Sequence, residues 1–249
     1  MILLETMAVA FGMFSALPVP QPEWTPRNMR YVLCAFPLVG AVCGLAWWGW
    51  GTACSVLGLP LLLQAAGLCV VPVLITGGIH LDGYADTCDA LASCAPPNEK
   101  QRVLADPHCG AFAVIRMCCY FVMMFGLCAS VQFTPRMLLC MGLCFMLERA
   151  LSGLAITLFP LAKDTGLAHT FASAADRKHV SSILLFMCAI LCAGLILFGG
   201  QLAVAAAAAA FWRYYRVAQK KFGGISGDLA GWFLQQAELW MLAALVAGQ

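Results

Sequence analysis

Residues 61–91 read LLLQAAGLCVVPVLITGGIHLDGYADTCDAL, an apolar run that passes directly into a segment with three aspartates. The run, 61–79, is long enough to cross the hydrocarbon core of a bilayer as a helix, which takes roughly 20 residues. If the chain stays helical beyond it, Asp82, Asp86 and Asp89 lie within roughly 60° of one another around the helix axis. The stretch therefore predicts a membrane helix followed by a stripe of three carboxylates.

This acidic stripe has two interpretations. Three like charges on one helix face repel each other, and a divalent cation that prefers oxygen ligands, Mg²⁺ or Mn²⁺, would offset that repulsion. Alternatively, the aspartates form a solvated helix start, where negative charge is favourable to the helix dipole. The whole chain has only 12 acidic residues in 249, so three in eight positions is a local concentration. The residues alone leave both interpretations open.

Composition determines the class of protein. Hydrophobic residues make up 62% of the chain and charged residues 10%, whereas soluble domains carry roughly 25% charged residues. We therefore expect an all-α, polytopic integral membrane protein. None of the 14 cysteines forms a C-x-x-C pair and most lie within apolar runs, so we interpret them as small apolar residues and expect no soft-metal site.

Seven apolar segments are candidates for transmembrane helices. Gly199-Gly200 divides the long run 181–217 into two, and the N-terminal 17 residues, interrupted by Glu5, favour a short surface or re-entrant helix. We expect one integral membrane domain, 1–249, with about seven transmembrane helices, at 33–57, 61–79, 110–131, 137–159, 181–198, 201–217 and 229–247.

The distribution of basic residues predicts the orientation. With seven spans, the N-terminus and the loops 80–109, 160–180 and 218–228 share one side, and nearly all loop lysines and arginines lie there, while Arg136 lies opposite. Because positive loops face the cytoplasm, we expect this orientation in a bacterial inner membrane. The loop 80–109 is the longest polar segment, so it is the predicted cytoplasmic active-site loop.

Three charged residues lie deep inside predicted spans: Glu148 and Arg149 in the fourth and Glu238 in the seventh. Such groups usually face the bundle interior or a water-filled cavity. Arg149 has two interpretations, an internal salt bridge with Glu238 as a candidate partner, or an anion contact. Near the C-terminus, Ser226 or Asp228 can cap the last helix, and the glycines around them permit close approach to a ligand.

Carboxylates, a divalent cation and basic residues at a membrane surface suit phosphoryl transfer. The sequence contains no G-x-x-x-x-G-K-[ST], G-x-S-x-G or H-E-x-x-H motif, which disfavours P-loop hydrolases, serine hydrolases and zinc proteases. Two alternatives are a CDP-alcohol-type phosphotransferase of lipid metabolism and a membrane transporter with an acidic site. The second half of the CDP-alcohol phosphotransferase motif is absent from this sequence. A transporter would place its carboxylates near the midplane of the bilayer.

The segment Thr-Gly-Gly-Ile-His-Leu-Asp-Gly-Tyr-Ala-Asp-Thr-Cys-Asp (76–89) resembles the signature G-G-[LI]-H-L-D-G-L-A-D-T-x-D of the adenosylcobinamide-GDP ribazoletransferases, also called cobalamin synthases. Further matches follow in the family's order over nearly the whole chain. They are Leu-Pro-Val-Pro (17–20), Phe-Pro-Leu-Val-Gly (36–40), Asp106 with Gly110-Ala-Phe, Lys-Asp-Thr-Gly-Leu (163–167), and Ser-Gly-Asp-x-x-Gly (226–231) with Glu238.

The resemblance implies a reaction. The hydroxyl of α-ribazole, or of its 5′-phosphate, attacks the cobinamide-linked phosphoryl group of adenosylcobinamide-GDP, GMP leaves, and adenosylcobalamin or its phosphate forms. It implies Mg²⁺ bound by Asp82, Asp86 and Asp89, which are also the catalytic residues. It implies substrate contacts from six further residues: His80, Asp106, Arg149, Lys163, Asp228 and Glu238. Besides the substrates and the lipid bilayer, it is compatible with a homo-oligomer and with association with other corrinoid-pathway enzymes; no nucleic acid is expected.

The chain departs from the family pattern at three positions. Ala105 and His108 stand where the family often has lysine and arginine, and Gln235 replaces the first of two glutamates. These differences predict altered phosphate contacts or lower activity, and they leave the three aspartates unchanged.

Overall fold

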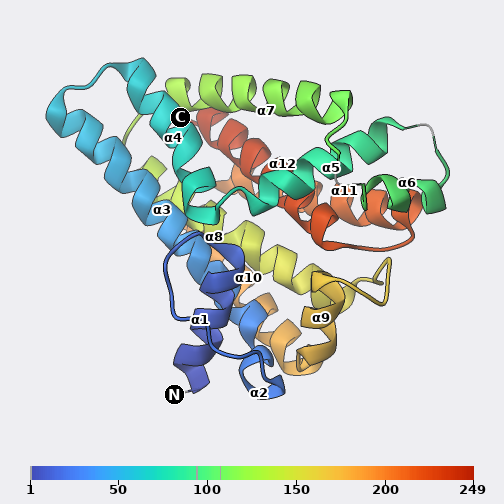
Figure 1. Cartoon of the computed structure of the whole chain (residues 1–249). Helices are drawn as coiled ribbons and strands as arrows, with labels where there is room; N and C mark the ends of the chain where they lie inside the picture. The colour runs from blue at the N-terminus through green and yellow to red at the C-terminus, as the bar shows by residue number, and fades with distance from the viewer. Residues whose placement is uncertain (1, 94, 107) are drawn as a thin grey trace.

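The computed structural model describes residues 2–93, 95–106 and 108–249. Helices dominate it, and the described part of the chain contains no β-strand, only an isolated bridge between Leu161 and Ile225. In chain order (Figure 1) the elements are α1 (Ile2–Phe14), α2 (Pro26–Met29), α3 (Val32–Leu57), α4 (Leu61–Thr76), α5 (Ile79–Ala92), α6 (Pro97–Val103), α7 (Ala111–Ser130), α8 (Pro135–Leu158), α9 (Leu167–Ala174), α10 (Arg177–Leu197), α11 (Gln201–Val217), the π-helix η1 (Ala218–Phe222) and α12 (Gly227–Ala247).

Five helices are long and apolar enough to cross a membrane: α3, α7, α8, α10 and α12. A sixth crossing is available if α4 and α5, which are bent by 97° relative to each other, count as one span. The expected all-α polytopic architecture is confirmed. By length and composition the count is five or six against the predicted seven, because α11 has only 17 residues. Helix α11 nevertheless runs from the Gly199-Gly200 end of the bundle to the end where Ile225 N donates to Pro160 O.

The predicted break in the run 181–217 is confirmed. Helix α10 ends at Leu197, and α11 begins at Gln201 after Gly199 and Gly200. Gly199 has a positive φ of 77°, a backbone conformation that other residues adopt at a cost. The expected N-terminal helix is also present, as the short apolar α1.

The sharp turn between α4 and α5 depends on two consecutive glycines. Gly77 and Gly78 have φ values of 66° and 80°, both left-handed, and side chains with a Cβ disfavour that region. Gly77 terminates α4 and Gly78 precedes α5. The chain therefore turns through 97°, so that α5 does not continue in the direction of α4.

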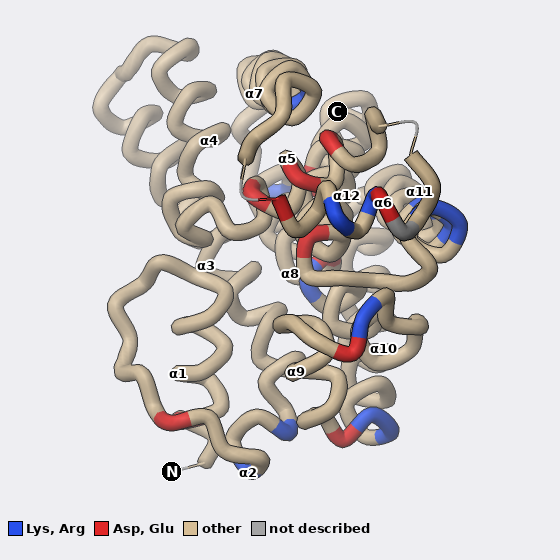
Figure 2. The backbone as a smooth tube through the Cα atoms, turned by 45° about the vertical axis from the view of Figure 1, so that its right-hand side comes forward, with Lys and Arg blue, Asp and Glu red and all other residues tan. Residues whose placement is uncertain are grey.

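Helix α8 forms the centre of the bundle, packed by α3, α10 and α12. At one end of the bundle, three loops that are distant in sequence are joined by hydrogen bonds. Gln101 Nε2 of α6 donates to the Phe222 carbonyl oxygen at 2.8 Å, and Ile225 N donates to Pro160 O at 2.9 Å. The loops 80–109, 160–180 and 218–228 therefore meet, as the shared-side prediction requires. Figure 2 shows charged segments gathered here, around α5, α6 and α12.

Candidate active site at the crossing of α5 and α12

Helices α5 and α12 cross at backbone contact (Figure 1). A Cβ on Gly83 would lie 2.8 Å from Asp228 Cα, and a Cβ on Gly231 would lie 2.8 Å from the carbonyl oxygen of His80. Real Cβ atoms essentially never approach backbone atoms this closely. The two glycines therefore allow a crossing that a side chain at either position would prevent, and the crossing brings Asp228 beside the acidic stripe.

The three aspartates of that stripe lie on one helix, as the spacing predicts. Asp82 is exposed, whereas Asp86 and Asp89 are half-buried. Partial burial raises the pKa of Asp86 to about 6, with smaller contributions from the negative charges of Asp82, Asp228 and Asp89. Four carboxylates, three from α5 and one from the start of α12, therefore interact electrostatically.

The first turn of α12 orients Asp228. Ser226 is the N-cap residue and its hydroxyl accepts a hydrogen bond from Leu229 N at 3.3 Å. The same hydroxyl donates to Asp228 Oδ2 at 3.4 Å. Of the two capping candidates, Ser226 is therefore the cap, and Asp228 keeps its carboxylate beside α5.

The donor chemistry fits a hard divalent cation, because all four side chains offer carboxylate oxygens. Their distances are less favourable: among the described residues, no group of three or more His, Cys, Asp or Glu side chains is gathered closely enough to hold a metal ion. A cation bound here would need further oxygen ligands from a substrate, or new side-chain rotamers. The expected Mg²⁺ ligation stays a prediction.

Lys163 supplies positive charge at this end of the bundle. Its side chain is exposed, its ammonium group lies 3.4 Å from the Gln101 carbonyl oxygen, and its charge acts on Asp228. An exposed, mobile cation beside carboxylates suits contact with a phosphate group.

Asp106 lies on an exposed turn. Its carboxylate accepts hydrogen bonds from His108 N at 3.0 Å and pairs with His108 Nδ1 at 2.7 Å. The hydrogen bonds from His108 lower the pKa of Asp106. Among the described residues, Asp106 therefore interacts with His108, which stands where the resembled family often has an arginine.

Arg149 forms the internal ion pair that was one of its two interpretations, with a different partner. Its guanidinium donates to Glu148 Oε1 at 2.6 Å and to the Phe145 carbonyl oxygen at 2.9 Å, and the residue is 1% exposed. Glu238 is also buried and interacts with Arg149 only through its charge. A phosphate contact by Arg149 is unsupported in this conformation and stays a prediction, as does the role of Glu238.

His80 is buried where α5 crosses α12. Its imidazole Nε2 has no hydrogen-bond partner, and its ring centroid lies 5.7 Å from that of Phe36. Phe14, Phe36 and Phe171 line the same cavity as His80. In the sequence Phe36 was recognisable only within the motif Phe-Pro-Leu-Val-Gly, and Phe14 and Phe171 were not indicated, because the three rings come from separate helices. Gly83 and Gly231, the two glycines of the helix crossing, were recognisable in the sequence only as parts of motifs.

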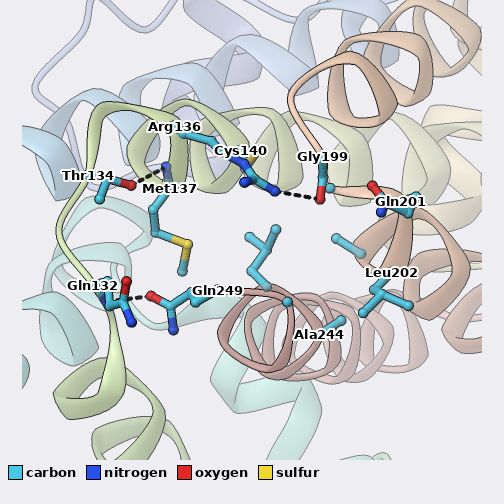
Figure 3. A pocket seen from close by; sticks show the side chains of 14 residues that line it. Gln132, Thr134, Arg136, Met137, Cys140, Gly199, Gln201, Leu202, Ala244 and Gln249 are labelled. Carbon is cyan, nitrogen blue, oxygen red and sulfur yellow. Dashed lines mark hydrogen bonds between the residues drawn. The ribbon is translucent and has the colours of Figure 1, made fainter.

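A hollow with a volume of about 310 Å³ lies at the end of the bundle opposite the α5–α12 crossing (Figure 3). Its polar groups are engaged internally: Arg136 donates to Phe198 O at 2.6 Å and to Gly199 O at 3.1 Å, and Gln249 pairs with Gln132. Its described lining includes no carboxylate. The hollow is therefore a poor candidate for phosphoryl-transfer chemistry.

Comparisons with known proteins identify the family of the chain. A sequence model of one family, described as Cobalamin-5-phosphate synthase, matches residues 6–246. An adenosylcobinamide-GDP ribazoletransferase of Lachnoclostridium phytofermentans is 39% identical, covering 99% of this chain and 95% of that protein. Proteins of the same name are 30% identical in Clostridium botulinum strain Alaska E43 (95% of each chain) and 29% identical in Pseudomonas fluorescens (95% and 97%). No solved structure gives a significant match.

Proposed function

The chain belongs to the cobalamin-5-phosphate synthase family, and we propose that it transfers the cobinamide-phosphoryl group of adenosylcobinamide-GDP to α-ribazole or α-ribazole 5′-phosphate. The nucleoside hydroxyl oxygen forms a bond to the cobinamide-linked phosphorus, the bond from that phosphorus to the bridging oxygen breaks, and GMP leaves with the electron pair. The product is adenosylcobalamin or its 5′-phosphate. The comparisons support neither a CDP-alcohol phosphotransferase nor a transporter.

The carboxylates at the α5–α12 crossing are the groups we assign to the reacting atoms. One carboxylate of the stripe Asp82, Asp86 and Asp89 accepts the proton of the attacking hydroxyl. Asp228 lies against α5 and contributes to the same acidic surface. Lys163 is placed to contact a phosphate, since it is exposed and acts on Asp228.

Phosphoryl transfer from an anionic diphosphate needs compensation of negative charge. We propose that Asp82, Asp86 and Asp89 hold Mg²⁺, which when bound would neutralise charge on the phosphate oxygens. The support is the oxygen-only donor set and the mutual repulsion of the four carboxylates. Without a cation these same carboxylates would repel an anionic substrate.

The protein is an integral membrane protein with five or six candidate spans. We propose that it lies in the bacterial inner membrane with the α5–α12 crossing on the cytoplasmic side. The support is the excess of basic residues in the loops at that end, which is typical of cytoplasmic loops. Self-association and association with other corrinoid-pathway enzymes stay predictions.

The observation that carries the proposal is the meeting of Asp82, Asp86 and Asp89 with Asp228 at the helix crossing. The test is conversion of adenosylcobinamide-GDP and α-ribazole by the purified, detergent-solubilised protein, with GMP and the cobalamin product measured together by chromatography. We expect equal amounts of the two products. GMP release without a cobalamin, or no reaction with either nucleoside form, would contradict the proposed activity.

A further inference from the structure

A mostly apolar cavity of about 290 Å³ opens beside the acidic stripe. Helices α1, α3, α5, α8, α9 and α12 all contribute to its lining. Asp82 and Asp228 line the cavity together with apolar side chains, so it adjoins the carboxylates assigned to the reaction.

Aromatic rings form one wall of the cavity. The ring centroids of Phe14 and Phe36 are 4.2 Å apart, those of Phe14 and Phe171 are 5.3 Å apart, and Phe36 lies 5.7 Å from His80. These four rings come from α1, α3, α9 and α5 and form one continuous surface. Such a surface favours a flat aromatic ligand through apolar burial and offset stacking.

His80 provides one polar atom in this apolar lining. It is 6% exposed, and its Nε2 is buried without a hydrogen-bond partner. A buried polar atom that lacks a partner is costly, so a ligand that hydrogen-bonds to it gains affinity. A neutral imidazole can donate or accept at Nε2 depending on its tautomer.

The lining excludes most parts of the two substrates. It contains two carboxylates and no lysine or arginine, so it repels phosphate groups. Guanine presents donors and acceptors along most of its edge, whereas away from the two carboxylates the lining offers only His80 and Ser152 as polar side chains, and a corrin ring is too large for about 290 Å³. The part that best matches a mostly apolar aromatic cavity is the base of α-ribazole, a flat bicyclic aromatic group whose one unsubstituted ring nitrogen carries a lone pair.

We propose that this cavity binds the benzimidazole base of α-ribazole, with His80 Nε2 donating to the free ring nitrogen and the ribose directed toward Asp82 and Asp228. This inference rests on the proposed function, and it names the substrate and the part of the substrate that the cavity accepts. In this assignment the aromatic wall selects the nucleoside, and adenosylcobinamide-GDP binds at the charged surface outside the cavity.

The test measures binding without turnover, by equilibrium dialysis of α-ribazole against the detergent-solubilised full chain. Ala168→Phe, on α9, places a ring in the cavity, and Phe171→Leu removes one ring from the wall while keeping an apolar side chain. We expect Ala168→Phe to weaken α-ribazole binding by roughly tenfold or more and Phe171→Leu by several-fold, without weakening adenosylcobinamide-GDP binding. Ser173→Phe on the same helix is the matched control, because Ser173 is exposed and lies outside the cavity lining.

A second measurement tests the histidine. The indole nucleoside that has a C–H in place of the free ring nitrogen should bind the wild-type chain several-fold more weakly than α-ribazole. His80→Phe should reduce that difference to near unity while keeping an aromatic ring in the wall. A His80→Phe variant that still discriminates between the two nucleosides would overturn the assigned hydrogen bond.

Two outcomes would overturn the cavity assignment: α-ribazole binding unchanged in folded Ala168→Phe, or a loss confined to adenosylcobinamide-GDP. Folding is checked by thermal midpoint and size-exclusion profile. The proposed function has a separate test, because wild-type turnover of both substrates can succeed while the cavity variants bind α-ribazole normally. Conversely, α-ribazole binding to the wild-type chain and the cavity variants can be measured even if the wild-type chain shows no turnover.

Discussion

Gly83 of α5 lies directly against Asp228 of α12, so that a Cβ at position 83 would come within 2.8 Å of both the Cα and the carbonyl oxygen of Asp228. This contact joins two segments separated by more than 140 residues of sequence and places the carboxylate of Asp228 near those of the α5 stripe. The close approach of Asp228 to the α5 stripe therefore requires that residue 83 has no Cβ atom.

Gly83→Ala tests this relationship. Alanine favours helix over glycine by up to about 1 kcal/mol, but its Cβ would displace the backbone of α12, and overpacking costs about 1–3 kcal/mol. We expect a lower thermal midpoint and a loss of GMP release of at least tenfold. Gly126→Ala on α7 is the matched control, since a Cβ there meets no atom within 4 Å; equal effects of the two substitutions would contradict the role of the crossing.

Asp82→Asn tests the exposed carboxylate of the stripe. The amide keeps the size of the side chain and removes both the charge and the ability to accept the hydroxyl proton as a carboxylate. We expect GMP release from adenosylcobinamide-GDP to fall by roughly 10²-fold or more, with an unchanged thermal midpoint. Wild-type-like release from folded Asp82→Asn would remove Asp82 from the mechanism, and Glu23→Gln, which neutralises an exposed carboxylate that is not assigned to the site, serves as the control.

Metal removal tests the predicted cation. Treatment with EDTA should abolish turnover, and Mg²⁺ or Mn²⁺ should restore it because both accept carboxylate and phosphate oxygens, whereas Zn²⁺ should restore it poorly for lack of nitrogen or sulfur ligands. Restoration is followed by GMP release as a function of added cation. Full activity in EDTA-treated protein, verified free of metal by elemental analysis, would argue against a metal at the stripe.

The ion pair between Arg30 and Asp176 predicts a pH-dependent stability contribution. Asp176 Oδ2 accepts a hydrogen bond from Arg30 Nε at 3.2 Å, and Asp176 also accepts from His179 N at the start of α10. The hydrogen bond from Arg30, followed by that from His179, lowers the pKa of Asp176. Because the folded pKa is lower than the unfolded one, the contribution is present above the ordinary pKa of about 3.9 and is lost as the pH falls toward the folded value.

Asp176→Asn removes this charge and keeps an oxygen that can cap α10. We expect its thermal midpoint to fall below that of the wild type at pH 7, with the difference shrinking as the pH approaches 3. A difference that is independent of pH would assign the effect to capping or packing instead of the ion pair.

Much of the local structure could be predicted because it depends on residues close in sequence. The break at Gly199-Gly200, the helical stripe of Asp82, Asp86 and Asp89, and a cap by Ser226 or Asp228 all follow from backbone preferences and helix periodicity. Length and composition alone give five or six candidate spans in the structure against the predicted seven, since α4 has 16 residues and α11 has 17.

The ion-pair partner of Arg149 was harder to predict from the sequence. Arg149 pairs with its neighbour Glu148 and not with Glu238, although both acids are buried in the same region. Which carboxylate an arginine reaches depends on side-chain rotamers and on the rotation of α8 against α12, and neither is encoded in spacing along the chain.

The sequence alone determined that this is a helical membrane protein with an acidic stripe following an apolar run, because composition and short-range periodicity carry that information. Only the tertiary structure decided that Asp228 joins the stripe and that rings from three other helices and His80 enclose a cavity beside the carboxylates. The physical reason is that these relationships arise from helices that meet at glycine contacts, where the approach of two backbones depends on the packing of the whole bundle.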